Sequence, residues 1–478
     1  MDSLAERISS IDMIISSSQS MVLDLPPSCI EFCPAHPSYF LVGTYNLQKE
    51  EDGGVDEEGL KDEEESDVKE EEGQRSQSRT GSIIVFQLQD GKARRIQTIP
   101  QPSAVFDLHF APQPDRGDIC AAVSSTGTIS LFRLCPETEA EVLRPFSSSG
   151  LRIQNSEEDT LLTYFAWHPT VPGLMAVNTA SGKVIFVQIN ETYQEATALG
   201  SPIIEHTMEA WCVAFSDLWD ESAESKKSSP LSTVFSGGDD SALILRPYWL
   251  SGDDSPDSTK SSTEDPGEDF DRDSDGDSDH SPVLFHLYDA KTIKGHEAGV
   301  TAILPLPLTL SDGSQIVLTG SYDDTLRAWA ITPPHKNYGM LKTKKLAEEN
   351  LGGGVWRLKV VEELSSFSGP GPWTVVVLAS CMHAGARIVT IRVDADPQAT
   401  LEIEVLARFE EHKSMNYGSD YSRDRGLRGL HFALSLLVSY TSPYRVPDII
   451  LKVAGILTVE GGIITIIEYF GLGVSTIS

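Results

Sequence analysis

The chain has little of what marks the common enzyme and secreted classes of protein. It contains no Gly-x-Ser-x-Gly nucleophile elbow, no His-Glu-x-x-His zinc motif and no Gly-Lys-Ser/Thr phosphate loop. An α/β-type serine hydrolase, a bound metal and a nucleotide cofactor are therefore not expected. The N-terminal letters MDSLAERISSIDMII have acids where a secretory signal has bases, so we expect a reduced, cytoplasmic protein. The cysteines form no Cys-x-x-Cys pair and no disulfide framework: Cys29, Cys33, Cys120, Cys135, Cys212 and Cys381.

Basic residues are also scarce. In the 478 residues, 37 Lys and Arg stand against 71 Asp and Glu, for a formal net charge of −34. No basic stripe appears, so nucleic-acid binding is not expected. The excess of acids is local, because residues 50–72 carry 14 acids and two lysines, and residues 250–280 carry 12 acids and two bases. Such segments bury too little apolar surface to fold. They predict disordered acidic inserts at about 49–80 and 250–281.

The clearest positive pattern is VLTGSYDDTLRAWAI at 317–331. It consists of an apolar run, a tight polar turn and a second short strand that contains Trp329. It resembles two neighbouring strands of a WD-type β-propeller blade. In such blades a His ahead of the first strand bonds the turn Asp, and the Trp covers the pair, which satisfies a buried polar turn. We therefore predict a bond between His296 and Asp323, covered by Trp329.

The same strand–turn–strand unit recurs in degraded form, giving six copies between residues 28 and 393. Alternating apolar and polar letters predict half-buried antiparallel strands, and units of this kind bury their faces only by closing into a ring. The predicted fold is an all-β, seven-bladed WD40-type propeller over residues 21–422, preceded by an N-terminal segment at 1–20. A seventh copy begins at Ser414, and we expect MVLDL, from Met21, to supply its outer strand.

Residues 423–478 break this pattern, with no Gly-x-Asp turn and no terminal Trp. Lys452, Glu460 and Glu468 cut the apolar runs below the roughly 20 residues of a membrane span, so no membrane contact is expected. We interpret this atypical apolar tail as a non-native last blade, from translated intron or frameshifted sequence.

Aligning the copies on their turns places six residues in one equivalent position: Asn46, Thr126, Ser181, Asp240, Asp323 and His383. For Asp240 and Asp323 a structural role in the turn is the simpler interpretation, and the same holds for His296. His383 stands where the fold favours Asp, and a residue that breaks a local rule is a functional candidate. Its neighbour Cys381 is either a nucleophile or, as is common for cysteine in strands, simply buried.

An ordered series of motifs carries a more specific resemblance: His206-x-x-Glu209-Ala210-Trp211, SGGDD at 236–240, GSYDD at 320–324, GGVWR at 353–357, CMH at 381–383 and YGSDY at 417–421. Over about residues 28–422 the chain resembles the WD-repeat diphthine methyl-esterase family of diphthamide biosynthesis. The resemblance implies a carboxylic-ester hydrolase that cleaves the methyl ester of methylated diphthine on translation elongation factor 2. A separate diphthine-amidating enzyme then acts on the product and is a possible partner. The alternative is a non-catalytic scaffold that docks both proteins.

Ester cleavage needs an activated nucleophile and a stabilised oxyanion. The candidate catalytic residues are His383, Asp239, Glu209 and Arg357. The first three are candidates to activate water, and the arginine to steady negative charge. The candidate substrate-binding residues are Trp356, Tyr322, His206 and Trp211. A tryptophan among them suits the trimethylammonium group that diphthine carries. Each also has an ordinary interpretation, as a core tryptophan, a solvent-facing loop acid, a snorkelling arginine or a framework histidine.

Overall fold

The computed structural model describes most of the chain outside the acidic segments. The described ranges are 13–47, 79–138, 141–156, 161–217, 232–250, 284–285, 288–335, 339–363, 373–393, 401–411, 415–422, 430–437, 450–460 and 463–467. The last three ranges, 284–285 and residues 13, 47, 217 and 362–363 are described by their backbone only. The predicted acidic inserts lie almost wholly outside these residues. Within them every regular element is a strand, and no helix is present that is long and apolar enough to cross a membrane.

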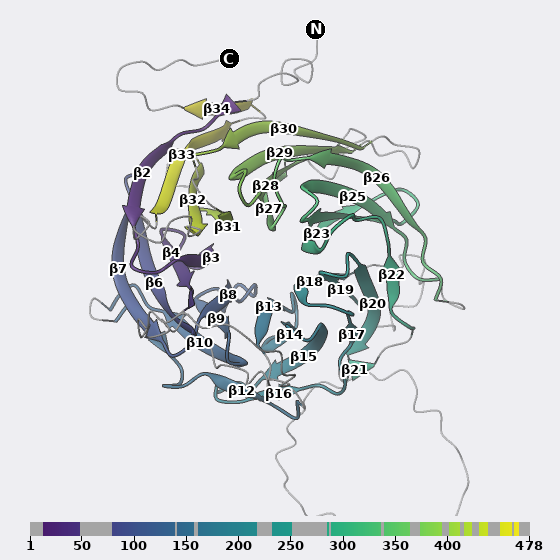
Figure 1. The fold of residues 1–478 in the computed structure, drawn as a ribbon, viewed down its shortest axis with the longest axis horizontal. Coiled ribbons are helices and arrows are strands. Elements are labelled where there is room, and N and C mark those ends of the chain that lie inside the picture. Colours follow the sequence, from purple (N-terminus) through teal and green to yellow (C-terminus); the bar gives the residue numbers. More distant parts are fainter. Residues whose placement is uncertain are drawn as a thin grey trace, which may run out of the picture.

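The strands form seven blades around a common axis (Figure 1), which confirms the predicted all-β propeller. Blade 1 contains β3 (Pro27–Phe32), β4 (Tyr39–Thr44), β5 (Asn46–Leu47), β6 (Arg79–Gln89) and β7 (Lys92–Gln101). Blade 2 contains β8 (Val105–Phe110), β9 (Ile119–Ser124), β10 (Thr128–Leu134), β11 (Leu143–Pro145) and β12 (Leu151–Gln154). Blade 3 contains β13 (Leu162–Trp167), β14 (Leu174–Thr179), β15 (Lys183–Ile189), β16 (Ala196–Ala198) and β17 (Ile204–Glu205). A short parallel pairing of β12 with β16 joins blades 2 and 3.

The remaining blades follow the same order from the axis outward. Blade 4 contains β18 (Ala210–Asp217), β19 (Ser232–Gly238), β20 (Leu243–Leu250), β21 (Leu284–Phe285) and β22 (Lys291–Ile293). Blade 5 contains β23 (Val300–Thr309), β24 (Gln315–Ser321), β25 (Thr325–Ile331) and β26 (Thr343–Asn350). Blade 6 contains β27 (Arg357–Glu363), β28 (Trp373–Ser380), β29 (Ala386–Val393) and β30 (Leu401–Phe409), with β1 (Met13–Ile14) parallel to β30.

Blade 7 closes the ring with strands from both ends of the chain. It contains β31 (Met415–Tyr421), β32 (Leu430–Leu437), β33 (Ile450–Glu460) and β34 (Ile463–Ile467), and β2 (Ser17–Val22) pairs antiparallel with β33. The expected N-terminal outer strand is therefore present, although it begins at Ser17, before the predicted boundary at residue 21. The boundary at residue 422 falls inside this sheet, because β32 and β33 come from the segment interpreted as a tail.

The turns that follow the second strand of each blade share one register. In blades 4, 5 and 6, five residues lie between the last two paired residues of the second and third strands. These pairs are Gly237 with Leu243, Gly320 with Leu326, and Ser380 with Ala386. The alignment of Asp240, Asp323 and His383 in one position follows from this register. These turns consequently lie on the same face of the ring.

The predicted bond from His296 to Asp323 is wrong. His296 Nε2 lies 2.8 Å from Thr319 Oγ1, which also accepts the indole N–H of Trp329 at 2.9 Å, so the tryptophan covers the histidine as expected. Asp323 is instead held by the Arg327 guanidinium at 2.8 Å and by the backbone N–H of Glu297, also at 2.8 Å. Asp323 therefore pairs with the buried Arg327 and not with His296.

Blade 4 shows the expected arrangement because it lacks that competitor. Ile244 stands where blade 5 has Arg327, and Asp240 is free to lie 2.9 Å from His206 Nδ1. Ser236 Oγ lies 3.0 Å from the other ring nitrogen of His206. The His206 side chain is completely buried, with both nitrogens occupied. Its predicted role in substrate binding therefore gives way to a framework role.

Apolar side chains fill the spaces between neighbouring blades. The interface of blades 5 and 6 buries Leu318, Val377 and Ile391, and that of blades 3 and 4 sets Phe186 against Tyr248 at 4.9 Å between ring centroids. Full burial of a side chain of this size contributes about 1.5–3 kcal/mol. The core is therefore a series of radial seams, which leaves polar residues of the inner strands facing the axis.

Candidate functional site

Four aromatic side chains from four different blades meet on one face of the ring. We call Trp211, Tyr322, Trp356 and Tyr417 the aromatic cluster. The Trp356 ring is central, with centroids 5.8 Å from Trp211, 5.8 Å from Tyr322 and 5.3 Å from Tyr417. All four residues are partly exposed. Three of them were predicted to bind substrate, and the fold brings these three together. Tyr417 was missed, although it begins the YGSDY motif.

The inner strands and turns place these rings. Trp211 lies at the start of β18, Trp356 immediately before β27 and Tyr417 near the start of β31, while Tyr322 lies in the turn after β24. Gly354 allows close packing here, because an added Cβ would lie only 2.7 Å from Met382 Sδ and 3.5 Å from the Tyr322 ring. The cluster is thus built from the amino-terminal ends of inner strands and from one blade turn.

A carboxylate accompanies the rings. Asp239 occupies the same turn position in blade 4 as Tyr322 does in blade 5. The two meet over Gly299, where an added Cβ would lie 2.7 Å from Asp239 Oδ1 and 3.0 Å from Tyr322 Cδ2. Burial raises the pKa of Asp239, and the negative charges of Glu209 and Asp240 raise it further. The nearby indole N–H of Trp211 lowers this pKa, although it does not reach full hydrogen-bond geometry.

Glu209 is adjacent to Asp239. Its backbone carbonyl accepts the Asp239 N–H at 2.9 Å, and its side chain is partly exposed. The structure therefore groups the two predicted catalytic acids with Trp211. Electron-rich ring faces beside carboxylates favour an organic cation, since cation–π attraction strengthens where water is displaced.

Arg357 is already paired within the protein, and its role at an oxyanion stays a prediction. Its Nη2 lies 2.6 Å from Asp107 Oδ2 across the ring, and its Nη1 donates to the backbone oxygens of Trp356 and Thr301 at 2.9 and 3.3 Å. The guanidinium also stacks on Tyr164 at 4.4 Å and on Trp356 at 4.7 Å from the ring centroids. An arginine held in this way supports the Trp356 ring, and its charge is already matched by Asp107.

That ion pair belongs to a chain of charges along the axis, which was not predicted. His109 Nε2 lies 3.6 Å from Asp107, and His109 Nδ1 lies 2.6 Å from Glu31. Lys359 Nζ lies 3.8 Å from Glu31 and 2.8 Å from Asp420. A signal was present in the sequence for four of them, because Glu31, Asp107, His109 and Lys359 interrupt the apolar letters of inner strands, in CIEF, FDLHF and RLKV.

The predicted catalytic residue His383 and its neighbour Cys381 lie in the turn between β28 and β29. His383 is exposed there, on the same face as the aromatic cluster, and its catalytic role stays a prediction. Cys381 is fully buried, and burial raises the pKa of its thiol to about 12. A nucleophilic thiolate at this position is therefore disfavoured. Among the described residues no three His, Cys, Asp or Glu side chains are grouped to hold a metal ion.

No protein-family model matches the chain. Comparison with known proteins finds two relatives. The chain is 25% identical over 356 residues to the diphthine methyltransferase of Schizosaccharomyces pombe, covering 73% of this chain and 81% of that protein. It is also 25% identical over 429 residues to the diphthine methyltransferase homolog of Dictyostelium discoideum, covering 84% of this chain and 90% of that protein.

These names correct the predicted activity. They describe methyl transfer, which contradicts the prediction of a carboxylic-ester hydrolase acting on a methyl ester. Asp107 pairs with Arg357, the arginine that this prediction assigned to an oxyanion.

Proposed function

We propose that this chain, which is similar to diphthine methyltransferases over most of its length, acts in methyl transfer at diphthine, with translation elongation factor 2 as its protein substrate. The observation that carries the proposal is the aromatic cluster with Asp239 beside it. Diphthine bears a trimethylammonium group, which has no N–H to donate and is recognised through aromatic faces and negative charge.

The cluster presents aromatic surface to this group. Trp356 has three aromatic neighbours at centroid distances of 5.3 to 5.8 Å, and the rings approach at tilted or edge-on angles rather than as a closed stack. Such angles leave ring faces available at the partly exposed surface. Asp239 and Glu209 add negative charge that draws a cation toward the rings.

Binding at the trimethylammonium group also serves the chemistry. A modified side chain held at its cationic end has fewer orientations at its reacting end, which lowers the entropic cost of reaching the transition state. His383 lies in the turn equivalent to that of Tyr322, in the neighbouring blade, on the same face. We propose it as the residue nearest the reacting end that can exchange a proton.

The binding step is tested with two matched peptides. One carries the trimethylammonium group and the other a neutral tert-butyl group of the same shape. We expect the cationic peptide to bind more tightly by about tenfold or more, and Trp356→Leu to remove that difference while Trp356→Phe retains part of it. Equal affinity of the two peptides would show that the cluster does not recognise charge.

The methyl-transfer step is tested on elongation factor 2 that carries diphthine. The purified chain, a sulfonium methyl donor and the substrate are incubated together, and the intact mass of elongation factor 2 is followed. We expect a gain of one methyl group on elongation factor 2, transferred from the sulfonium donor, which is left as a thioether; the gain should require the chain and be slowed in Trp356→Leu. Tight binding with no change in mass would instead favour the non-catalytic scaffold.

A further inference from the structure

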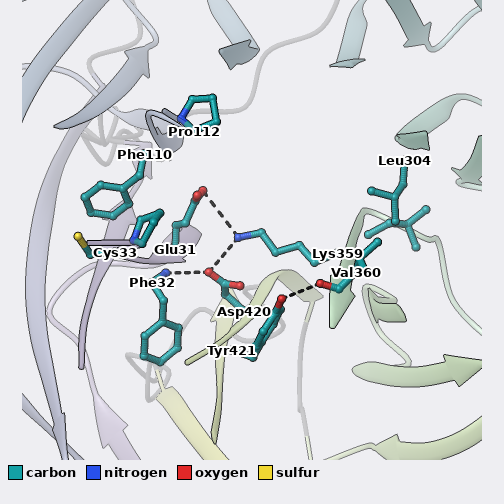
Figure 2. Close-up of a pocket in the computed structure, with 12 residues that line it drawn as sticks. Glu31, Phe32, Cys33, Phe110, Pro112, Leu304, Lys359, Val360, Asp420 and Tyr421 are labelled. Carbon is teal, nitrogen blue, oxygen red and sulfur yellow. Dashed lines mark hydrogen bonds and ion pairs between the residues drawn. The ribbon is translucent and has the colours of Figure 1, made fainter. Parts of the chain in front are cut away.

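A cavity lies toward the opposite end of the inner strands from the aromatic cluster. It is a cavity of about 330 Å³ whose walls are largely apolar, with Phe32, Phe110, Pro112, Leu304 and Val360 among them. Figure 2 shows Glu31, Lys359 and Asp420 meeting in it, between these apolar side chains. The inner strands run from one face of the ring to the other. Trp356 precedes β27 and Tyr417 begins β31, whereas Val360 and Asp420 lie further along the same strands.

The charged residues of the cavity are unbalanced. Two carboxylates, Glu31 and Asp420, share the single ammonium group of Lys359, at 3.8 and 2.8 Å. Asp420 Oδ2 also accepts the backbone N–H of Phe32 at 2.7 Å, and the Asp420 side chain is only 5% exposed. Burial raises the pKa of Asp420, and the Glu31 charge adds to this, while Lys359 opposes it.

The neighbouring arginine does not supply the missing positive charge. Arg357 is matched by Asp107 at 2.6 Å. Behind Glu31 stands His109, a titratable group 2.6 Å away, whose pKa is raised by Asp107 and Glu31 against the effect of burial. A protonated His109 balances the set, and a neutral His109 leaves one excess negative charge beside the cavity.

The chemistry of the cavity selects among ligands. An anion would meet two carboxylates. A metal ion would meet the Lys359 ammonium group, which occupies the position between the two carboxylates where a metal would bind. An organic cation also meets the Lys359 group, but only an organic cation has an apolar body to replace water against the aromatic and proline walls while its charge lies near Asp420 and Glu31.

We propose that this cavity is a second binding site, for a primary ammonium or guanidinium group carried on an apolar stem. Lysine and arginine side chains of a protein partner and small free amines share that chemistry. The proposal is independent of the function assigned to the aromatic cluster, since no residue is common to the two sites.

The test uses the full chain and 2-phenylethylammonium as probe, with 2-phenylethanol as its neutral counterpart. Binding is measured by calorimetry in the Trp356→Leu background, so that the aromatic cluster does not contribute. We expect the ammonium compound to bind with 1:1 stoichiometry and about tenfold more tightly than the alcohol, since the alcohol leaves the carboxylates without a charged partner. Equal binding of the two compounds would overturn the proposal.

Two variants with opposite expected signs locate the site. Asp420→Asn keeps an acceptor for the Phe32 N–H but removes the charge, and it should weaken the ammonium compound about tenfold without affecting the alcohol. Lys359→Met removes the competing cation and should strengthen the ammonium compound. The second variant keeps the test decisive if the first fails to fold. Unchanged affinity in both variants would place the probe elsewhere.

A peptide arm separates the two sources of the ligand. An acetylated Phe-Arg-Phe amide is compared with Phe-citrulline-Phe, which has the same shape without the charge. Preference for the arginine peptide over the free amine assigns the cavity to a protein partner, and the reverse order assigns it to a small amine.

Discussion

Replacing Arg357 by methionine is expected to destabilise the fold strongly, although polar residues in strands ordinarily face water and tolerate substitution. The Asp107 carboxylate, 3% exposed, would lose a partner at 2.6 Å and keep the backbone N–H of Leu108 at 2.9 Å and the more distant His109. Removing one partner of a buried ion pair costs about 3–5 kcal/mol, because the remaining charge is left without compensation. Loss of the stacking on Tyr164 adds to this cost.

A matched surface pair provides the control. Arg95 lies 2.8 Å from Asp24, nearly the same distance, but the two side chains are 48% and 79% exposed. Arg95→Met should therefore change the free energy of unfolding by less than about 1 kcal/mol. Both variants are compared with the unmodified chain by the midpoint of urea denaturation and by thermal melting.

The double variant Asp107→Leu with Arg357→Met gives the decisive measurement. If desolvation of an unpaired charge dominates, removing both charges should restore part of the stability lost in Arg357→Met alone. The description of Arg357 as a buried partner of Asp107 is refuted by either of two results. One is that the stability losses of Asp107→Leu and Arg357→Met, each measured alone, add up in the double variant. The other is that Arg357→Met costs no more than Arg95→Met. Binding of the trimethylammonium peptide should weaken in Arg357→Met as well, because the guanidinium supports the Trp356 ring.

Three further outcomes are expected. Gly299→Ala should weaken binding of the trimethylammonium peptide by several fold with little change in fold, because its Cβ would displace the Asp239 carboxylate, 2.7 Å away; unchanged affinity in a peptide titration would contradict this. Burial lowers the pKa of His296 to about 4 from 6.5, so the unfolded chain takes up more protons between these values. Stability should therefore fall as the pH drops from 6.5 toward 4, by roughly 3 kcal/mol, and His296→Gln should flatten that dependence in denaturation curves. Deleting residues 1–22 removes β2 and should lower the melting temperature by opening blade 7, whereas an unchanged melting curve would show that this strand does not close the ring.

The blade architecture could be predicted from the sequence because its signals are local. A strand, a turn with five residues between the last paired positions, and a second strand recur within a few tens of residues, so each copy carries its own evidence. The aromatic cluster was partly predictable for the same reason. Trp211, Tyr322 and Trp356 occupy fixed positions relative to blade turns, and equivalent positions in a ring converge on one face.

The pairing of charged residues was not predictable in this way, because it depends on competition and on distance along the chain. Arg327 replaced the expected histidine as the partner of Asp323, although both patterns satisfy the same turn. Arg357 and Asp107 are 250 residues apart and meet only because β8 and β27 both line the axis. A single sequence gives no signal that relates two such positions.

The alternation that revealed the strands also explains why the pairing of Arg357 with Asp107 was not predicted. In an ordinary half-buried strand the polar letters face water, and a charged residue there is available to a ligand. In the inner strand of a propeller those letters face the axis, where charges of opposite blades replace water. An axial charge is therefore first a candidate partner for another blade, as Arg357 is for Asp107. The charge left over after such pairing, here the second carboxylate beside Lys359 whenever His109 is neutral, is the better guide to a ligand.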